Sequence, residues 1–178
     1  MKKSLYLRLI PVVLIILLFP ASGLAESPEK PLQLSIFTPL QIHNQETDIR
    51  GLRLSLIYGF NQDLKGLDIG LVNRLGGDLN GVQLGLANFV NGNGKGLQAA
   101  FYNQAQDYRG VQLGVANTAQ KTHGVQLGII NSAIDMDGLQ IGLLYNSTDT
   151  LRGIQIGLLN FIWDRKPVFF FPIINAAF

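Results

Sequence analysis

Apolar and polar residues alternate along most of the chain, and a glycine restarts the alternation every 14 or 15 residues. Eight such segments follow one another from Gly51, with aliphatic side chains at positions 2, 4 and 6, as in residues 81–88 (GVQLGLAN). Strict alternation predicts a β-strand with one buried face, because successive side chains of a strand point to opposite sides. A helix would need apolar spacings of three and four and would lose about 1 kcal/mol at each glycine. We therefore expect short strands whose aliphatic residues are buried.

The remaining positions of the repeat are equally regular. The opening glycines are Gly51, Gly66, Gly81, Gly96, Gly110, Gly124, Gly138 and Gly153. Position 3 is glutamine in six units: Gln83, Gln98, Gln112, Gln126, Gln140 and Gln155. Position 8 is asparagine in Asn73, Asn88, Asn103, Asn117, Asn131 and Asn160, and Asn146 follows one place later. Gly and Asn both tolerate the backbone conformations of turns, so we expect them at the corners of each unit.

Two all-β architectures are compatible with this repeat. In a β-solenoid of about ten short coils, identical residues stack and their amide side chains bond along the stack. In an antiparallel up-and-down β-barrel of about ten strands, each strand needs about 9 to 11 alternating residues to cross a membrane. The clean alternation covers only about six, although the terminal Phe178 is typical of barrels. In most units an apolar residue precedes the Gly by two places, and its odd distance from position 2 interrupts a single long strand. We expect the solenoid and keep the barrel as the alternative.

The N-terminus has the pattern of a secretory signal peptide. Lys2, Lys3 and Arg8 precede the apolar residues 9–19, and Gly23 and Ala25 place small residues before a cleavage site. The predicted organisation is a signal peptide (1–25), a degenerate repeat and loop (26–50), eight tandem repeats (51–166) and a capping segment (167–178). We expect export to the outer membrane, cell surface or periplasm of a Gram-negative bacterium.

Charge and candidate chemistry exclude several functions. Cleavage after residue 25 would leave 11 basic and 12 acidic residues, a net charge of −1, and remove the electrostatic basis for binding nucleic acid. The histidines, His43 and His123, lie about five units apart, without further ligands at metal-binding spacing. We assign no catalytic, cofactor or metal-binding residue and expect a protein that is not an enzyme.

The repeated glutamines are the candidate binding face. A flat array of amides at Gln83, Gln98, Gln112, Gln126, Gln140 and Gln155 could contact the outer membrane or an envelope glycan or protein. The alternative is that these side chains only stabilise the stack.

The pattern Gly-[Val/Leu/Ile]-Gln-[Leu/Ile]-Gly-[aliphatic]-x-Asn, seen in residues 81–88, 110–117 and 124–131, resembles uncharacterised bacterial surface-repeat proteins. The resemblance covers about residues 31–178. It implies an exported envelope protein with surface or outer-membrane association and a structural or binding role, and it supplies no catalytic residues.

Overall fold

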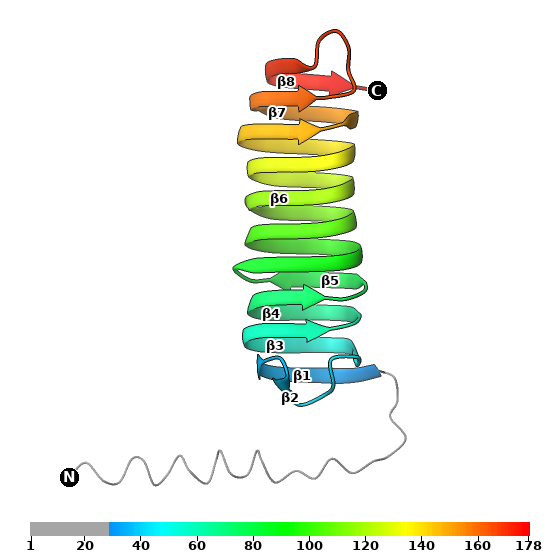
Figure 1. Cartoon of the computed structure of the whole chain (residues 1–178), viewed down its shortest axis with the longest axis vertical. Helices are drawn as coiled ribbons and strands as arrows, with labels where there is room; N and C mark the ends of the chain where they lie inside the picture. Colours follow the sequence, from blue (N-terminus) through cyan, green and yellow to red (C-terminus); the bar gives the residue numbers. More distant parts are fainter. Residues whose placement is uncertain (1–28) are drawn as a thin grey trace, which may run out of the picture.

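The computed structural model describes residues 29–178, which form one β-solenoid (Figure 1). Its strands are β1 (Glu29–Phe37), β2 (Leu40–Gln41), β3 (Asp48–Asn61), β4 (Leu64–Leu75), β5 (Leu79–Leu84), β6 (Ala87–Thr148), β7 (Thr150–Ile162) and β8 (Phe170–Ala177). The described residues make about nine parallel turns, which confirms the solenoid and excludes the barrel alternative. The expected signal peptide (1–25) lies outside the described residues.

Each coil stacks on the next in the register that the repeat predicts. Gly51 pairs with Gly66, Gly66 with Gly81, and Gly138 with Gly153. Strand β1 joins the stack in parallel with β3, whereas β8 runs antiparallel to β7. The C-terminal segment therefore closes the stack as a reversed strand and does not repeat the coil.

The side of the strand that faces inward differs from the expectation. Gln112 is fully buried, whereas its neighbour Leu113 remains 49% exposed and Val115 41% exposed. The expectation that the aliphatic residues at positions 2, 4 and 6 are buried is therefore wrong. Alternation over a strand defines two faces but does not say which one is enclosed.

The inverted orientation also changes where the alternation breaks. In most units the residue two places before the Gly is apolar. This residue and the glutamine at position 3 both point inward and lie four residues apart, as Leu79 and Gln83 do. An even step lets the alternation continue through the Gly. The interruption lies between positions 3 and 8, which are both buried although they lie five residues apart, as Gln83 and Asn88 do. The interruption that we expected at the Gly is therefore absent, although the solenoid architecture is confirmed.

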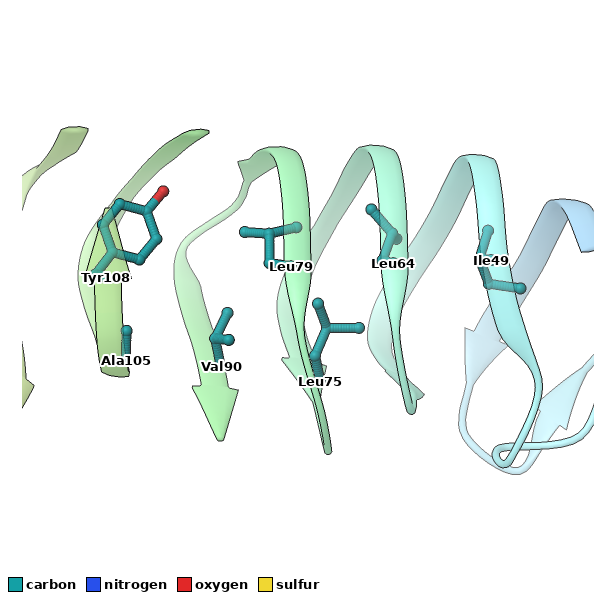
Figure 2. Close-up of a cluster of buried hydrophobic side chains, with 7 residues drawn as sticks. All are labelled: Ile49, Leu64, Leu75, Leu79, Val90, Ala105 and Tyr108. Atoms are coloured by element: carbon teal, nitrogen blue, oxygen red, sulfur yellow. The ribbon is translucent and has the colours of Figure 1, made fainter. Parts of the chain in front are cut away.

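A narrow apolar core fills the rest of the interior. Seven buried side chains line the first coils in Figure 2: Ile49, Leu64, Leu75, Leu79, Val90, Ala105 and Tyr108. The Tyr108 ring occupies the space beside Gly94, where an added Cβ would lie 2.3 Å from the ring. Burial raises the pKa of the Tyr108 hydroxyl. In these coils the core is thus a column of one or two apolar residues beside the polar positions 3 and 8, whereas Thr122 takes the corresponding buried place before Gly124.

The opening glycine of each unit is required by the stacking itself. All eight have positive φ; that of Gly124 is 143°, a backbone conformation that L side chains rarely adopt. A Cβ at Gly124 would lie 2.2 Å from the carbonyl oxygen of Gly110 in the preceding coil. Only glycine lets consecutive coils approach to strand-pairing distance at this corner.

Candidate functional site

The six glutamines at position 3 form a continuous buried ladder. The Nε2 group of Gln98 donates to Oε1 of Gln83 at 2.9 Å, and Gln112 donates to Gln98 at 2.8 Å. The same bond links Gln126 to Gln112, Gln140 to Gln126 and Gln155 to Gln140, each at 2.8 Å. Every donor points toward the N-terminal coils. Aligned amides polarise one another, so the ladder strengthens as it lengthens.

A buried ion pair ends this ladder at its N-terminal side. Unit two has Asp68 where later units have glutamine, and its Oδ2 accepts from Gln83 Nε2 at 2.9 Å. Arg53 of unit one holds the same carboxylate through Nε at 2.7 Å and through Nη2 at 2.5 Å. Both side chains are fully buried. The carboxylate thus faces the donor end of the aligned amides, and the guanidinium balances its charge.

The asparagines form a second ladder that runs in the opposite direction. Asn103 Nδ2 donates to Asn117 Oδ1 and Asn117 Nδ2 to Asn131 Oδ1, both at 2.9 Å and toward the C-terminal coils. The second N–H of Asn117 bonds the carbonyl of Leu127 at 2.8 Å. Glycine at position 5 makes room for these amides: a Cβ at Gly128 would lie 2.8 Å from Asn117 Nδ2. The dipoles of the two ladders oppose each other.

These contacts decide the role of the predicted binding residues. The candidate face, Gln83, Gln98, Gln112, Gln126, Gln140 and Gln155, is fully buried. An enclosed amide cannot touch a partner, so the prediction of an accessible amide array is corrected. The alternative, that these glutamines stabilise the stack, agrees with the observed hydrogen bonds. The repeat positions Gly66, Gly81, Gly96, Gly110, Gly124, Gly138 and Gly153 and Asn73, Asn88, Asn117, Asn131 and Asn160 all lie in the stacking contacts.

The surface that the coils do present at these strands is apolar. We define the apolar outer face as positions 2, 4 and 6 of the eight units. Its residues are Leu52, Leu54, Leu56, Leu67, Ile69, Leu71, Val82, Leu84, Leu86, Leu97, Ala99, Phe101, Val111, Leu113, Val115, Val125, Leu127, Ile129, Leu139, Ile141, Leu143, Ile154, Ile156 and Leu158. Position 6 is the most prominent: Leu143 is 70% exposed and Phe101 65% exposed. With coils about 4.8 Å apart, the face extends about 34 Å along the stack. It is therefore far larger than the scattered apolar residues of an ordinary surface.

Charged residues stand beside this face in two columns. The cationic column lies one residue before each opening Gly and contains Arg50, Lys65, Asn80, Lys95, Arg109, His123, Asp137 and Arg152. Its Asp137 lies 3.7 Å from His123 Nδ1 and 3.9 Å from Arg152 Nη1. The acidic column lies two residues earlier and contains Asp48, Asp63, Asp78, Asn93, Asp107, Lys121, Asp135 and Thr150. The cationic column is the nearer one in sequence to the apolar outer face.

The sequence held signals for features that our predictions missed. Opposite charges at position 3 of consecutive units, Arg53 and Asp68, indicate a pair within the ladder once the coils are known to stack. The residue before each Gly is basic in five of eight units, which indicates a column of positive charge along the stack.

Other chemistry is sparse in the part of the chain that is described. Residues 29–178 contain no group of three or more His, Cys, Asp or Glu that could hold a metal ion. No helix within this range is long and apolar enough to cross a membrane. An open pocket on the polar side of the coils is lined by Gly92, Asn93, Gln106, Asp107, Gln120 and Lys121. It contains a single carboxylate and a single ammonium group.

Comparison with family models, with curated proteins and with solved structures finds no match. The chain is a parallel β-solenoid with stacked Asn and Gln ladders that repeat about every 15 residues.

Proposed function

We propose that the protein is a non-enzymatic, exported repeat protein of the bacterial cell envelope that works as a binding or structural surface. The signal-peptide pattern of residues 1–25 and the resemblance of the repeat to bacterial surface-repeat proteins support the location. The binding surface is the apolar outer face and not the glutamine array.

The single observation that carries this proposal is the exposure of aliphatic side chains in consecutive coils. Monomeric soluble proteins seldom expose contiguous apolar patches larger than a few hundred square ångströms, and larger ones mark interaction sites. Here the exposure repeats at position 6 in Leu56, Leu71, Leu86, Val115, Leu143 and Leu158. The fold does not need this pattern in order to close, because the interior is filled by the ladders and the apolar column. Burial of this face against a partner would release ordered water from all the coils together.

Cell fractionation tests the proposal. The triple variant Leu86→Glu, Leu113→Glu and Leu143→Glu places three charges on the apolar outer face. A matched control, Gln62→Glu, Gln106→Glu and Gln120→Glu, places three charges on exposed positions outside it. We expect the wild-type protein and the control to remain with the envelope fraction and the face variant to be released into the soluble fraction. Equal retention of the face variant, with an unchanged circular dichroism spectrum, would exclude the apolar outer face as the binding surface.

A further inference from the structure

The apolar outer face has a composition that fits an apolar phase better than a shaped protein partner. Its 24 positions hold no charged or hydrogen-bonding side chain, and nearly the same aliphatic residues recur in every coil. Specific protein interfaces concentrate their binding energy in a few aromatic or arginine anchors that fill pockets. Phe101 is the only aromatic residue among these positions. The rest of the surface is aliphatic and supplies no such anchors, whereas it suits lipid chains, which need no complementary shape.

The backbone beneath this face is compatible with lipid contact. Parallel pairing of the coils uses the strand N–H and C=O groups in bonds along the stack, as the pairing of residues 135–142 with residues 150–157 shows. Unpaired backbone groups are what normally prevents a sheet from entering an apolar phase. The face can therefore lie on hydrocarbon without burying unpaired strand groups, except at the two ends of the stack.

The cationic column supplies the second, independent observation. Arg50, Lys65, Lys95, Arg109 and Arg152 are exposed, and each stands one residue before a Gly that opens a strand of the apolar outer face. They therefore recur along one edge of that face from the first unit to the last, with interruptions at Asn80, His123 and Asp137, and Arg50 lies 2.6 Å from Glu29. Lipid phosphates lie just above the acyl chains, and basic residues near an anionic membrane surface contribute favourably to binding.

The acidic column does not neutralise the positive charge at the edge of the apolar outer face. It lies two residues further from the apolar outer face, with the cationic column in between. Two of its carboxylates are turned along the stack: Asp48 accepts from the backbone N–H of Asp63 at 3.2 Å, and Asp63 accepts from that of Asp78 at 2.6 Å. The charge nearest to the apolar edge is thus positive, although the mature chain is close to neutral.

We propose that the apolar outer face lies on an anionic lipid leaflet, with the acyl chains against positions 2, 4 and 6 and the lipid phosphates against the cationic column. This inference rests on the proposed function, because it names the occupant of the same face. The solenoid axis lies parallel to the membrane, and the acidic column and the pocket beside Asp107 face the water. The side chains reach the boundary between headgroups and acyl chains, the depth typical of surface-bound amphipathic elements.

Vesicle flotation with the purified protein tests the inference. The probes are vesicles of phosphatidylcholine alone and vesicles containing phosphatidylglycerol. We expect binding to both, with an affinity for the anionic vesicles that is more than about 30-fold higher and that falls as salt screens the cationic column. The Leu86→Glu, Leu113→Glu and Leu143→Glu variant should bind neither vesicle.

A charge variant separates the two parts of the surface. Lys95→Gln with Arg109→Gln should weaken binding to anionic vesicles by about 30-fold and leave binding to phosphatidylcholine unchanged. The control, Lys121→Gln with Lys166→Gln, removes the same charge away from the cationic column and should bind as the wild type does. Equal binding of the wild type to both vesicles, or equal loss in both charge variants, would overturn the assignment of the cationic column to lipid phosphates.

Light scattering in the absence of lipid distinguishes a second copy of the chain as the occupant. A stable dimer that the leucine-to-glutamate variant dissociates, together with no vesicle binding, would overturn the lipid inference and leave the apolar outer face as the binding surface. A monomer that floats with anionic vesicles supports both proposals. A monomer that binds no vesicle, combined with envelope retention that is independent of the face, would overturn both.

Discussion

The interior of the coil and the apolar outer face reverse the usual distribution of polarity. At Gln112 and Leu113, two neighbouring residues of one strand, the amide is buried and the aliphatic side chain is half exposed. A buried amide without a partner is costly, but here each one meets an identical amide in the next coil. The comparison shows that repetition can make a polar interior acceptable, since every donor finds an acceptor one strand spacing away.

The two regions also differ in how they depend on the stack. The ladders exist only between coils, because an isolated coil has no neighbour to receive its Nε2 group. An intramolecular hydrogen bond contributes about 0.5 to 1.5 kcal/mol, and aligned bonds reinforce one another. The outer aliphatic residues gain only partial burial against their neighbours above and below. The ladders therefore hold the fold together, and the outer face is left available for another role.

The largest loss of stability is expected at the ion pair that ends the glutamine ladder. Asp68→Ala leaves the Arg53 guanidinium buried without its carboxylate, and we expect a loss of about 3 to 5 kcal/mol in the free energy of unfolding. The double variant Arg53→Gln with Asp68→Gln extends the uncharged ladder and should recover most of that loss. Urea denaturation monitored by circular dichroism measures both. Equal destabilisation of single and double variants would contradict the pairing.

The next test concerns the corner that brings the coils close enough to form the ladders. Gly124→Ala combines an unfavourable positive φ with a Cβ at 2.2 Å from the Gly110 carbonyl oxygen. We expect a loss of about 3 kcal/mol in the free energy of unfolding. Gly76→Ala is the control, because its nearest atoms belong to the movable side chains of Gln62 and Phe60. Thermal unfolding should show a large shift for the first variant and a small one for the second.

A smaller loss of stability is expected when one glutamine of the buried ladder is replaced by an apolar residue. Gln112→Leu removes the donor to Gln98 Oε1 and the acceptor of Gln126 Nε2. Two buried polar groups then each lose a partner, and the burial of leucine offsets part of the penalty. We therefore expect a loss of about 2 kcal/mol in the free energy of unfolding. Chemical denaturation at one pH is sufficient. A variant more stable than the wild type would show that the ladder is not a stabilising element.

The smallest effect is expected one residue further along the same strand. Leu113→Gln adds a polar group to a side chain that is already half exposed, and we expect less than about 1 kcal/mol in the free energy of unfolding. The same change should weaken vesicle binding measurably, because it interrupts the apolar outer face. A destabilisation equal to that of Gln112→Leu would mean that the two faces are equivalent.

Local residue chemistry was enough to predict several parts of the fold. Glycine at position 1 indicated a corner, and the recurrence of identical residues indicated a stack with amide ladders. Asparagine at position 8, which we expected at the other corner, lies within the strands without positive φ and contributes its amide to the second ladder. The cationic column could not be recognised from the repeat alone, because Asn80, His123 and Asp137 interrupt it and because its meaning depends on which face is exposed. The pairing of Arg53 with Asp68 likewise needs two units to be brought into register.

The sequence by itself determined the period, the strands and the residues that meet between coils, because copies of one short unit can pair only with themselves. Only the tertiary structure decided which face is inside. Alternation with a period of two is symmetric, and the usual assumption that the apolar face is buried selects the wrong one here. Stacking at strand spacing satisfies the amides of Gln83 to Gln140 inside the coil, which leaves the aliphatic residues on the surface.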